Sequence, residues 1–184
     1  MATLVFDIET AAQPPENFDE AQLEYLFRDA ARLEDEPARA ARRAEIQQLF
    51  SLWPLTAQVL CIGMVNVETA RGKVLFQAAD PDPDPPPPGA PGEPAEAVEF
   101  LPFCDESELL EAFWELVRRY ETVVTFNGRG FDVPFLYLRS AVLNVPITRK
   151  DWLGYRFASE PHCDLAEQLT FYGCLLYTSD AADE

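Results

Sequence analysis

The run LVFDIET, residues Leu4–Thr10, constrains the fold most, because it places two acids inside an apolar strand. Residues Thr3–Ile8 have the composition of a buried strand, where an unpaired charge is costly. Side chains alternate across a strand, so Asp7 and Glu9 project from the same face. Either the strand ends at Asp7 and both acids are solvated at its rim, or they belong to a site. Paired carboxylates suit Mg²⁺ or Mn²⁺.

Length and composition limit the possible classes of protein. A chain of 184 residues with 48% hydrophobic residues predicts one globular domain with a sizeable core. Its 32 acidic and 14 basic residues give a net charge of −18, which argues against a broad basic surface for nucleic acid. Four cysteines without metal-ligand spacing and a single histidine argue against a zinc site. Scattered thiols, short apolar runs and an N-terminus without a leader signal predict a soluble, cytoplasmic protein with no membrane partner.

Strand and helix patterns alternate along the chain. Helices are expected at residues 20–33 and 38–50, separated by Pro37, within an insertion at about 14–55. Further strands are expected at 58–67, 73–78, 98–103 and 122–126, and further helices at 106–120 and 131–143. This order predicts an α/β fold with a mixed central sheet flanked by helices.

Two segments do not fit this pattern. Residues 80–94 contain eight prolines and alternating acids, which cannot complete a sheet ladder and predict an exposed, extended loop. A solvated insertion is the favoured interpretation, and a site for a proline-reading partner is the alternative. The tail CLLYTSDAADE, residues 174–184, resembles a translated sequencing-library adapter, so we expect it to be non-native and the domain at 1–173 to be cut short.

A second group of polar residues lies in TFNGRGFDVPFL, Thr125–Leu136. An apolar strand runs into the turn signal Asn127–Gly128, and Asp132 follows in the first turn of a helix. The helix dipole alone favours an acid at that position. Alternatively, adjacent parallel strands would bring Asp132 beside Asp7 and Glu9, at the carboxyl ends where ligand sites of open α/β sheets lie.

Together, LVFDIET and VTFNGRGFDVPFL resemble motifs I and II of the DEDD (DnaQ-like) 3′–5′ exonucleases, which have a ribonuclease H-like fold. The NGxxFDxPF form most resembles the branch related to the exonuclease domain of family B DNA polymerases. WPLTAQVLCIGMV resembles the second strand of that branch, and HCDL, His162–Leu165, resembles the element that follows motif II. The resemblance spans about residues 3–173, with the helical insertion and the proline loop as embellishments.

The resemblance implies roles for individual residues. Asp7, Glu9 and Asp132 would be catalytic and would hold two divalent ions, Mg²⁺ or Mn²⁺, for phosphodiester hydrolysis. Asp164 would support the site. The residues implied to bind the 3′ end are Ile8, Thr10, Asn127, Gly128 and Phe131, although Asn127 also suits a turn and Phe131 also suits a core.

The fourth carboxylate of the family, on motif III, is not found. His162 and Glu167 have a related spacing, but they follow Asp132 too closely and Glu replaces Asp, so we do not assign them to motif III. We therefore expect a metal-dependent 3′–5′ exonuclease for single-stranded or frayed DNA that is inactive as this chain. RNA is the alternative substrate, and a non-catalytic binding module or an endonuclease of the same fold are the rival functions.

A metal-dependent exonuclease is compatible with the acidic net charge, because bound divalent ions would offset the negative charge at the site. Arg139, Arg149, Lys150 and Arg156 cluster after motif II. They are expected to form either a path for a nucleic-acid strand or an ordinary solvated face.

Overall fold

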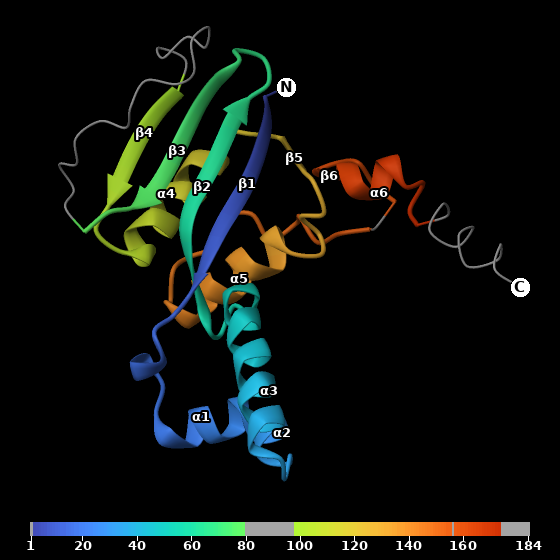
Figure 1. The fold of residues 1–184 in the computed structure, drawn as a ribbon. Coiled ribbons are helices and arrows are strands. Elements are labelled where there is room, and N and C mark those ends of the chain that lie inside the picture. The colour runs from blue at the N-terminus through green and yellow to red at the C-terminus, as the bar shows by residue number, and fades with distance from the viewer. Residues whose placement is uncertain (1, 80–97, 156, 174–184) are drawn as a thin grey trace, which may run out of the picture.

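A computed structural model describes residues 2–79, 98–155 and 157–173 of the chain (Figure 1). Six strands form one mixed sheet in the order β4-β3-β2-β1-β5-β6. The strands are β1 (Thr3–Ala12), β2 (Ala57–Asn66), β3 (Arg71–Gln77), β4 (Val98–Phe103), β5 (Thr122–Thr125) and β6 (His162–Asp164). The helices are η1 (Pro15–Asn17), α1 (Glu20–Leu26), α2 (Arg28–Ala31), α3 (Glu36–Gln48), η2 (Leu49–Leu52), α4 (Glu106–Val117), α5 (Asp132–Val142) and α6 (Leu165–Leu169).

The predicted α/β fold with a mixed sheet is confirmed. β1 is antiparallel to β2 and parallel to β5, and β5 is parallel to β6. The carboxyl ends of these three parallel strands therefore meet at one edge of the sheet. The predicted proline loop at 80–94 and the predicted adapter-like tail at 174–184 lie outside the described residues.

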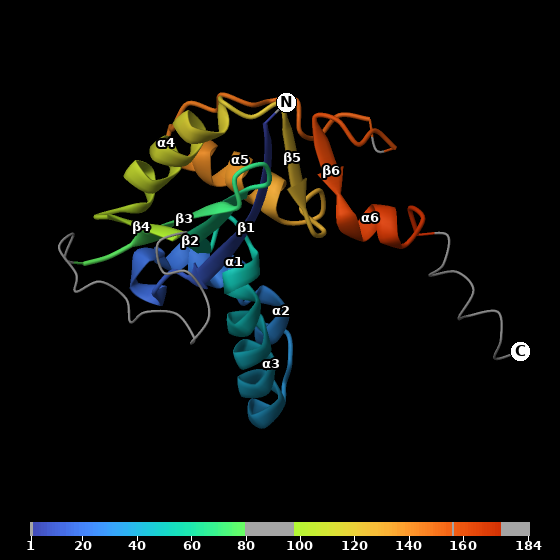
Figure 2. The ribbon, with the colours of Figure 1, turned by 90° about the horizontal axis from the view of Figure 1, so that it is seen from above.

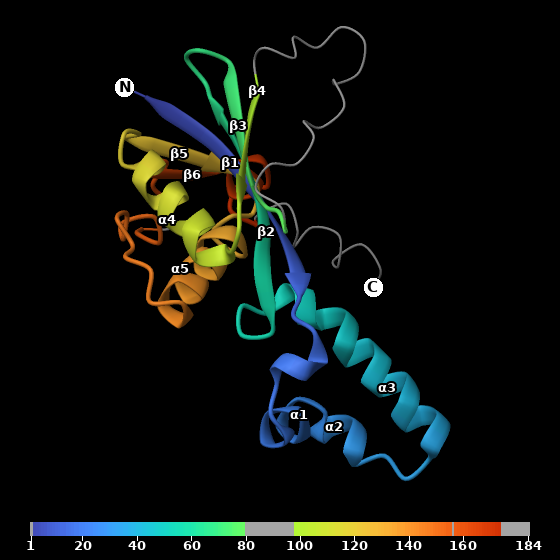
Figure 3. The same ribbon diagram turned by 90° about the vertical axis from the view of Figure 1, so that its left-hand side faces the viewer.

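One face of the sheet is covered by α4 and α5 (Figures 1 and 3). Leu4, Phe6 and Ile8 of β1 point to that face and are at most 5% exposed, in a core that includes Phe113 and Trp114 of α4. We call the other face the open face. Following the strand register, it carries Val5, Asp7 and Glu9 of β1, Val65, Gly63 and Cys61 of β2, and Val98 and Phe100 of β4.

β1 is longer than the sequence pattern predicts. It continues to Ala12, because β2 pairs with it as far as that residue after a register shift between Glu9 and Thr10. The interpretation in which the strand ends at Asp7 is therefore wrong. Both acids lie within a paired strand and share its open face.

The expected helical insertion forms an arm that projects on the side of the sheet away from α4 and α5 (Figures 2 and 3). Its first helix is shorter than predicted, because the chain leaves helical geometry at Phe27, where α1 ends and α2 begins. Pro37 does not interrupt a helix but lies in the first turn of α3, where proline is tolerated. The arm has its own small core of Phe27, Ala30, Ile46 and Phe50.

A buried ion pair between Glu106 of α4 and Arg139 of α5 connects both covering helices to β2 and to the segment in which the arm returns to β2. The Glu106 carboxylate accepts hydrogen bonds from Arg139 Nε at 2.9 Å and from the Val59 amide at 2.8 Å. Arg139 also donates to the carbonyl of Pro54, where the arm returns to β2. The expectation of an exposed basic cluster is therefore wrong for Arg139, which is 3% exposed.

The rest of that expected cluster is dispersed. Arg149 pairs with Asp151 and donates to the carbonyls of Tyr120 and Glu121, while Lys150 is exposed. Arg156 lies outside the described residues. Of the described arginines in this expected cluster, Arg139 and Arg149 thus donate to backbone carbonyls of neighbouring segments.

We predict that Arg139→Leu destabilises the fold by about 3–5 kcal/mol, because it leaves the Glu106 carboxylate buried without its partner. The double variant Glu106→Gln/Arg139→Leu should recover part of the loss, since a glutamine oxygen can still accept from Val59. Urea denaturation of the three proteins measures both effects. Equal stability of the single and double variants would contradict this account.

Candidate functional site

The carboxyl end of β5 brings the two acidic motifs together. β5 ends at Thr125, so the Ile8 amide of β1 lies beyond the end of its neighbouring strand. The Asp132 carboxylate, at the start of α5, takes the place of a strand partner and accepts from the Ile8 amide at 3.2 Å. This contact joins residues 124 positions apart in the sequence. Asp132 therefore lies beside the backbone of Ile8, between Asp7 and Glu9 in the sequence.

The Asp132 carboxyl is difficult to ionise. Its pKa is raised to about 6, mainly by burial and also by the charge of the nearby Asp7 and a side-chain hydrogen bond with it. Backbone hydrogen bonds, including the one from Ile8, act in the opposite direction. Asp7 and Asp132 therefore interact directly as like charges, a relation typical of functional sites.

Glu9 completes the acidic group from the open face. Glu9 pairs with Cys61 across the β1–β2 ladder, and Asp7 pairs with Gly63. Burial raises the pKa of the Cys61 thiol, and the charges of Glu9 and Asp7 raise it further. Both acids thus lie close to the same thiol.

The chemistry of these donors fits a hard divalent cation. Asp7, Glu9 and Asp132 offer only carboxylate oxygens, and none of them takes part in an ion pair within the described part of the chain. Yet residues 2–79, 98–155 and 157–173 contain no ready-made group of three His, Cys, Asp or Glu side chains that could hold a metal. The metal-binding role of the three acids therefore stays a prediction.

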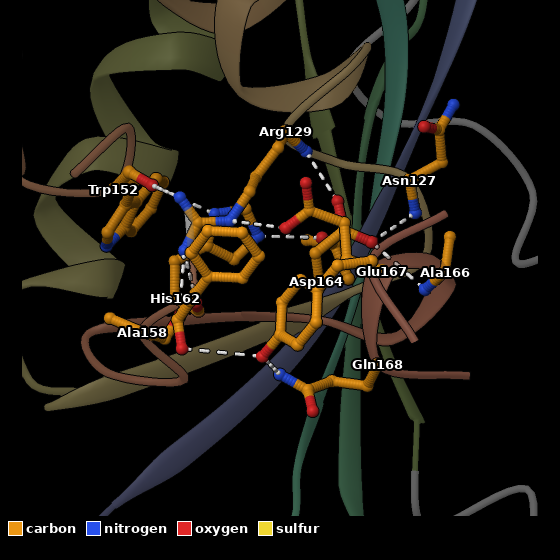
Figure 4. A network of polar contacts seen from close by, with 12 residues as sticks. Asn127, Arg129, Trp152, Ala158, His162, Asp164, Ala166, Glu167 and Gln168 are labelled. Atoms are coloured by element: carbon orange, nitrogen blue, oxygen red, sulfur yellow. Dashed lines mark hydrogen bonds and ion pairs between the residues drawn. The ribbon is translucent and has the colours of Figure 1, made fainter. Parts of the chain in front are cut away.

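Asp164 fixes the loop that leads from β5 to Asp132 (Figure 4). Its carboxylate accepts from the backbone amides of Asn127 at 2.8 Å, Arg129 at 2.9 Å and Ala166 at 3.0 Å. Asn127 has a φ of 60°, a left-handed conformation that asparagine tolerates. The carboxylate thus holds the turn by its backbone, and the support that Asp164 gives to a catalytic site stays a prediction.

Arg129 links the same loop to the segment before β6, and sequence reasoning missed it. Its guanidinium donates to the carbonyls of Trp152, Ala158 and His162 and pairs with Glu167 at 3.3 Å (Figure 4). No local pattern could have revealed this role, because every partner lies more than twenty positions away along the chain.

His162 is part of the core beneath this loop. It is fully buried, and its Nδ1 lies 3.0 Å from the Trp152 carbonyl, so Nδ1 donates and Nε2 accepts from the Thr125 hydroxyl at 2.7 Å. Burial lowers the pKa of the imidazole, which favours this neutral form. With His162 held by Thr125 and Glu167 by Arg129, neither is placed beside Asp7.

The other predicted substrate residues also have structural contacts. Gly128 lies so close to Thr125 that a Cβ would approach its Oγ1 to 2.1 Å, so the turn requires glycine. The Thr10 hydroxyl donates to the Ser51 carbonyl at the base of the arm. Phe131 is half-buried and packs on Phe135, with ring centroids 5.4 Å apart. Their contacts with substrate stay predictions.

We predict that Asp132→Asn stabilises the metal-free protein at pH 8 relative to wild type and has little effect at pH 4. The folded protein holds the Asp132 proton more tightly than the unfolded chain does, so ionisation weakens the fold as the pH rises from 3.8 through about 6. An asparagine oxygen can still accept from Ile8. Thermal unfolding in EDTA across this range measures the difference. A difference that does not grow with pH would contradict it.

Asp164→Ala should lower the free energy of unfolding by about 3 kcal/mol, because it removes a charged acceptor from three backbone amides. Cys163→Ala is the matched control, since its half-buried side chain lies on the same strand without anchoring the turn. Chemical denaturation compares the two variants. Similar losses in both would show that Asp164 is not the anchor of the turn.

Comparisons with known proteins agree with the motifs. Residues 101–179 match a family model described as a predicted 3′–5′ exonuclease related to the exonuclease domain of PolB. DNA polymerase 1 of Sulfolobus acidocaldarius is 39% identical over 68 residues, which cover 34% of this chain and 8% of the polymerase. DNA polymerase 1 of Sulfurisphaera ohwakuensis is 40% identical over 42 residues, covering 23% and 5%. The chain therefore spans a small part of these polymerases.

No helix in the described residues is long and apolar enough to cross a membrane. The mixed six-stranded sheet with flanking helices is consistent with a ribonuclease H-like exonuclease fold. The match over residues 101–179 and the two polymerase alignments thus confirm the resemblance carried by the motifs, and support the branch of the DEDD 3′–5′ exonucleases related to the exonuclease domain of PolB.

Proposed function

We propose that this chain is a metal-dependent 3′–5′ exonuclease domain that acts on the 3′ end of single-stranded or frayed DNA. The observation that carries the proposal is the hydrogen bond from the Ile8 amide to Asp132, which joins motif I to motif II at one edge of the sheet. The family match supports the exonuclease class. The choice of DNA over RNA rests on the polymerase relatives.

Asp7, Glu9 and Asp132 would hold the divalent ions, Mg²⁺ or Mn²⁺. When bound, such ions supply positive charge to a phosphodiester under attack and lower the pKa of water. The protein fixes Asp132 through the Ile8 amide and the turn held by Asp164, and it leaves Asp7 and Glu9 exposed on the open face. A strand end can therefore approach the acids from that face.

Proton binding at Asp132 competes with metal binding in this scheme. Its pKa of about 6 means that the carboxyl is largely protonated below that pH. Metal affinity should fall accordingly as the pH drops from 7 to 5, since the ligand must be deprotonated.

A non-catalytic binding module is the second candidate. It is favoured by one observation, that the described residues hold no ready-made metal group of three side chains. The two functions differ in whether Mn²⁺ changes the interaction with a strand end, and whether that change depends on Asp7 and Asp132.

The test combines binding and digestion of a 5′-labelled single strand with Mn²⁺ or EDTA. We expect Mn²⁺ to strengthen binding of the linear strand by a factor at least about tenfold larger than the factor for a circular strand. Asp7→Asn or Asp132→Asn should abolish this gain. Turnover by this chain should be slow or absent without a fourth carboxylate. Val5→Thr, beside Asp7 on the same face, is the matched control.

Three outcomes would overturn parts of this proposal. Metal-independent binding that survives both substitutions would identify a binding module. Cleavage of the circular strand would identify an endonuclease. Rapid stepwise digestion from the 3′ end, lost in Asp7→Asn, would support the exonuclease and contradict the need for a fourth carboxylate.

A further inference from the structure

The helix-covered face of the sheet carries polar residues near the hairpin that joins β2 to β3. In the strand register, Leu4 is opposite Asn66, and Asn66 is opposite Arg71. Lys73, two residues after Arg71 on the same strand, is level with Glu99 of β4. Because side chains alternate, these four polar residues share the face of the buried Leu4. They lie at the end of the sheet farthest from the arm (Figure 1).

A pocket of about 340 Å³ lies between this end of the sheet and the last turn of α4, and we call it the hairpin pocket. Leu4 and Met64 line it from the sheet, and Leu116 lines it from α4. These three side chains give the pocket an apolar floor. Its size suits a small organic molecule, since ligand pockets begin at about 300 Å³.

Two half-buried polar groups in the wall of the pocket have unused hydrogen-bonding capacity. The Asn66 side chain uses its Oδ1 to accept from the amide and hydroxyl of Thr69 in the hairpin turn. Its Nδ2 lies 3.5 Å from the Tyr120 hydroxyl oxygen, a long contact. Among residues 2–79, 98–155 and 157–173, that hydroxyl has no other hydrogen-bond partner. Both groups can therefore donate to an acceptor that enters the pocket.

The charges at the pocket leave one cation without a partner. Lys73 and Glu99 both line the pocket and pair with each other, so their charges cancel. Arg71 also lines the pocket, and its guanidinium takes part in no ion pair within the described part of the chain. The hairpin pocket therefore carries a net charge of one positive unit, in a chain whose net charge is −18.

We propose that the hairpin pocket binds a small carboxylate with an apolar body of the size of one aromatic ring. The planar guanidinium of Arg71 binds the carboxylate, and the apolar floor contacts the body. A single negative charge matches the single unpaired cation, whereas a phosphate monoester carries nearly two charges at neutral pH and is repelled more strongly by so acidic a chain.

This site is separate from the acidic group of the candidate active site. Leu4 lies in the same strand as Asp7, but the two side chains project from opposite faces of the sheet. A molecule in the hairpin pocket therefore does not contact the acids, and the proposal does not depend on the exonuclease function. A ligand that binds only the folded chain should also raise its unfolding temperature.

The test is isothermal titration of the full chain with four probes. Phenylacetate has both the charge and the apolar body, phenylacetamide has the body without the charge, and acetate has the charge with almost no body. Phenyl phosphate carries the same ring with a second negative charge. We expect phenylacetate to bind at least about tenfold more tightly than each of the other three, because it alone matches both the floor and the cation.

Two variants separate the charge from the hydroxyl. Arg71→Ala should weaken binding of phenylacetate at least about tenfold and leave binding of phenylacetamide nearly unchanged. Tyr120→Phe keeps the ring and should weaken binding of phenylacetate about threefold. Arg119→Ala is the matched control, since this exposed arginine does not line the pocket and its loss changes the net charge by the same amount. Without ligand, Arg71→Ala and Arg119→Ala should unfold at the temperature of wild type, because both side chains are exposed.

Four outcomes would overturn the proposal. Absence of saturable binding by phenylacetate would show that the pocket holds only water. Equal affinity for phenylacetate and phenylacetamide would remove the role of the charge, and tighter binding of phenyl phosphate would replace the carboxylate by a phosphate. Equal losses of phenylacetate affinity in Arg71→Ala and Arg119→Ala would show attraction to the chain as a whole and not to this pocket.

Discussion

The hydrogen bond between the Ile8 amide and the Asp132 carboxylate is the interaction on which the site depends. It exists because β5 is only four residues long, which leaves the Ile8 amide of the central strand β1 without a partner in β5. A buried unpaired amide is costly, and a carboxylate from the next helix satisfies it. The same contact holds the Asp132 oxygens beside Asp7, where their repulsion weakens the metal-free fold. One hydrogen bond therefore satisfies the backbone of β1 and also holds two carboxylates close together.

The remainder of the structure can be understood as support for that bond. The turn after β5 has a left-handed residue at Asn127 and a glycine at position 128 that lies close to the Thr125 side chain. Asp164 and Arg129 hold this turn from the β6 side through backbone groups. These contacts join residues 33 to 37 positions apart, so they form only when β6 lies beside β5.

Sequence alone predicted the parts that depend on local pattern. The strand at Thr3–Ile8, the amphipathic helix expected at 106–120 and found at 106–117, and the strand–turn–helix around Asp132 follow from periodicity and turn chemistry. Their motifs resemble the exonuclease branch that the family match supports. The extension of β1 to Ala12 was missed because it depends on pairing with β2 across a bulge. Burial of Arg139 was missed because its partner Glu106 is 33 positions away.

The arm between β1 and β2 has a consequence for how the protein folds. These strands are antiparallel neighbours at the centre of the sheet, yet 44 residues separate their pairing ends at Ala12 and Ala57. What is usually a fast local hairpin has become a long-range closure, with a larger entropy cost. The arm's small aromatic core offsets that cost, because folding the arm early shortens the effective loop and brings the two strand ends together. Loosening Phe50 at its centre should therefore slow assembly of the sheet more than it weakens the finished site.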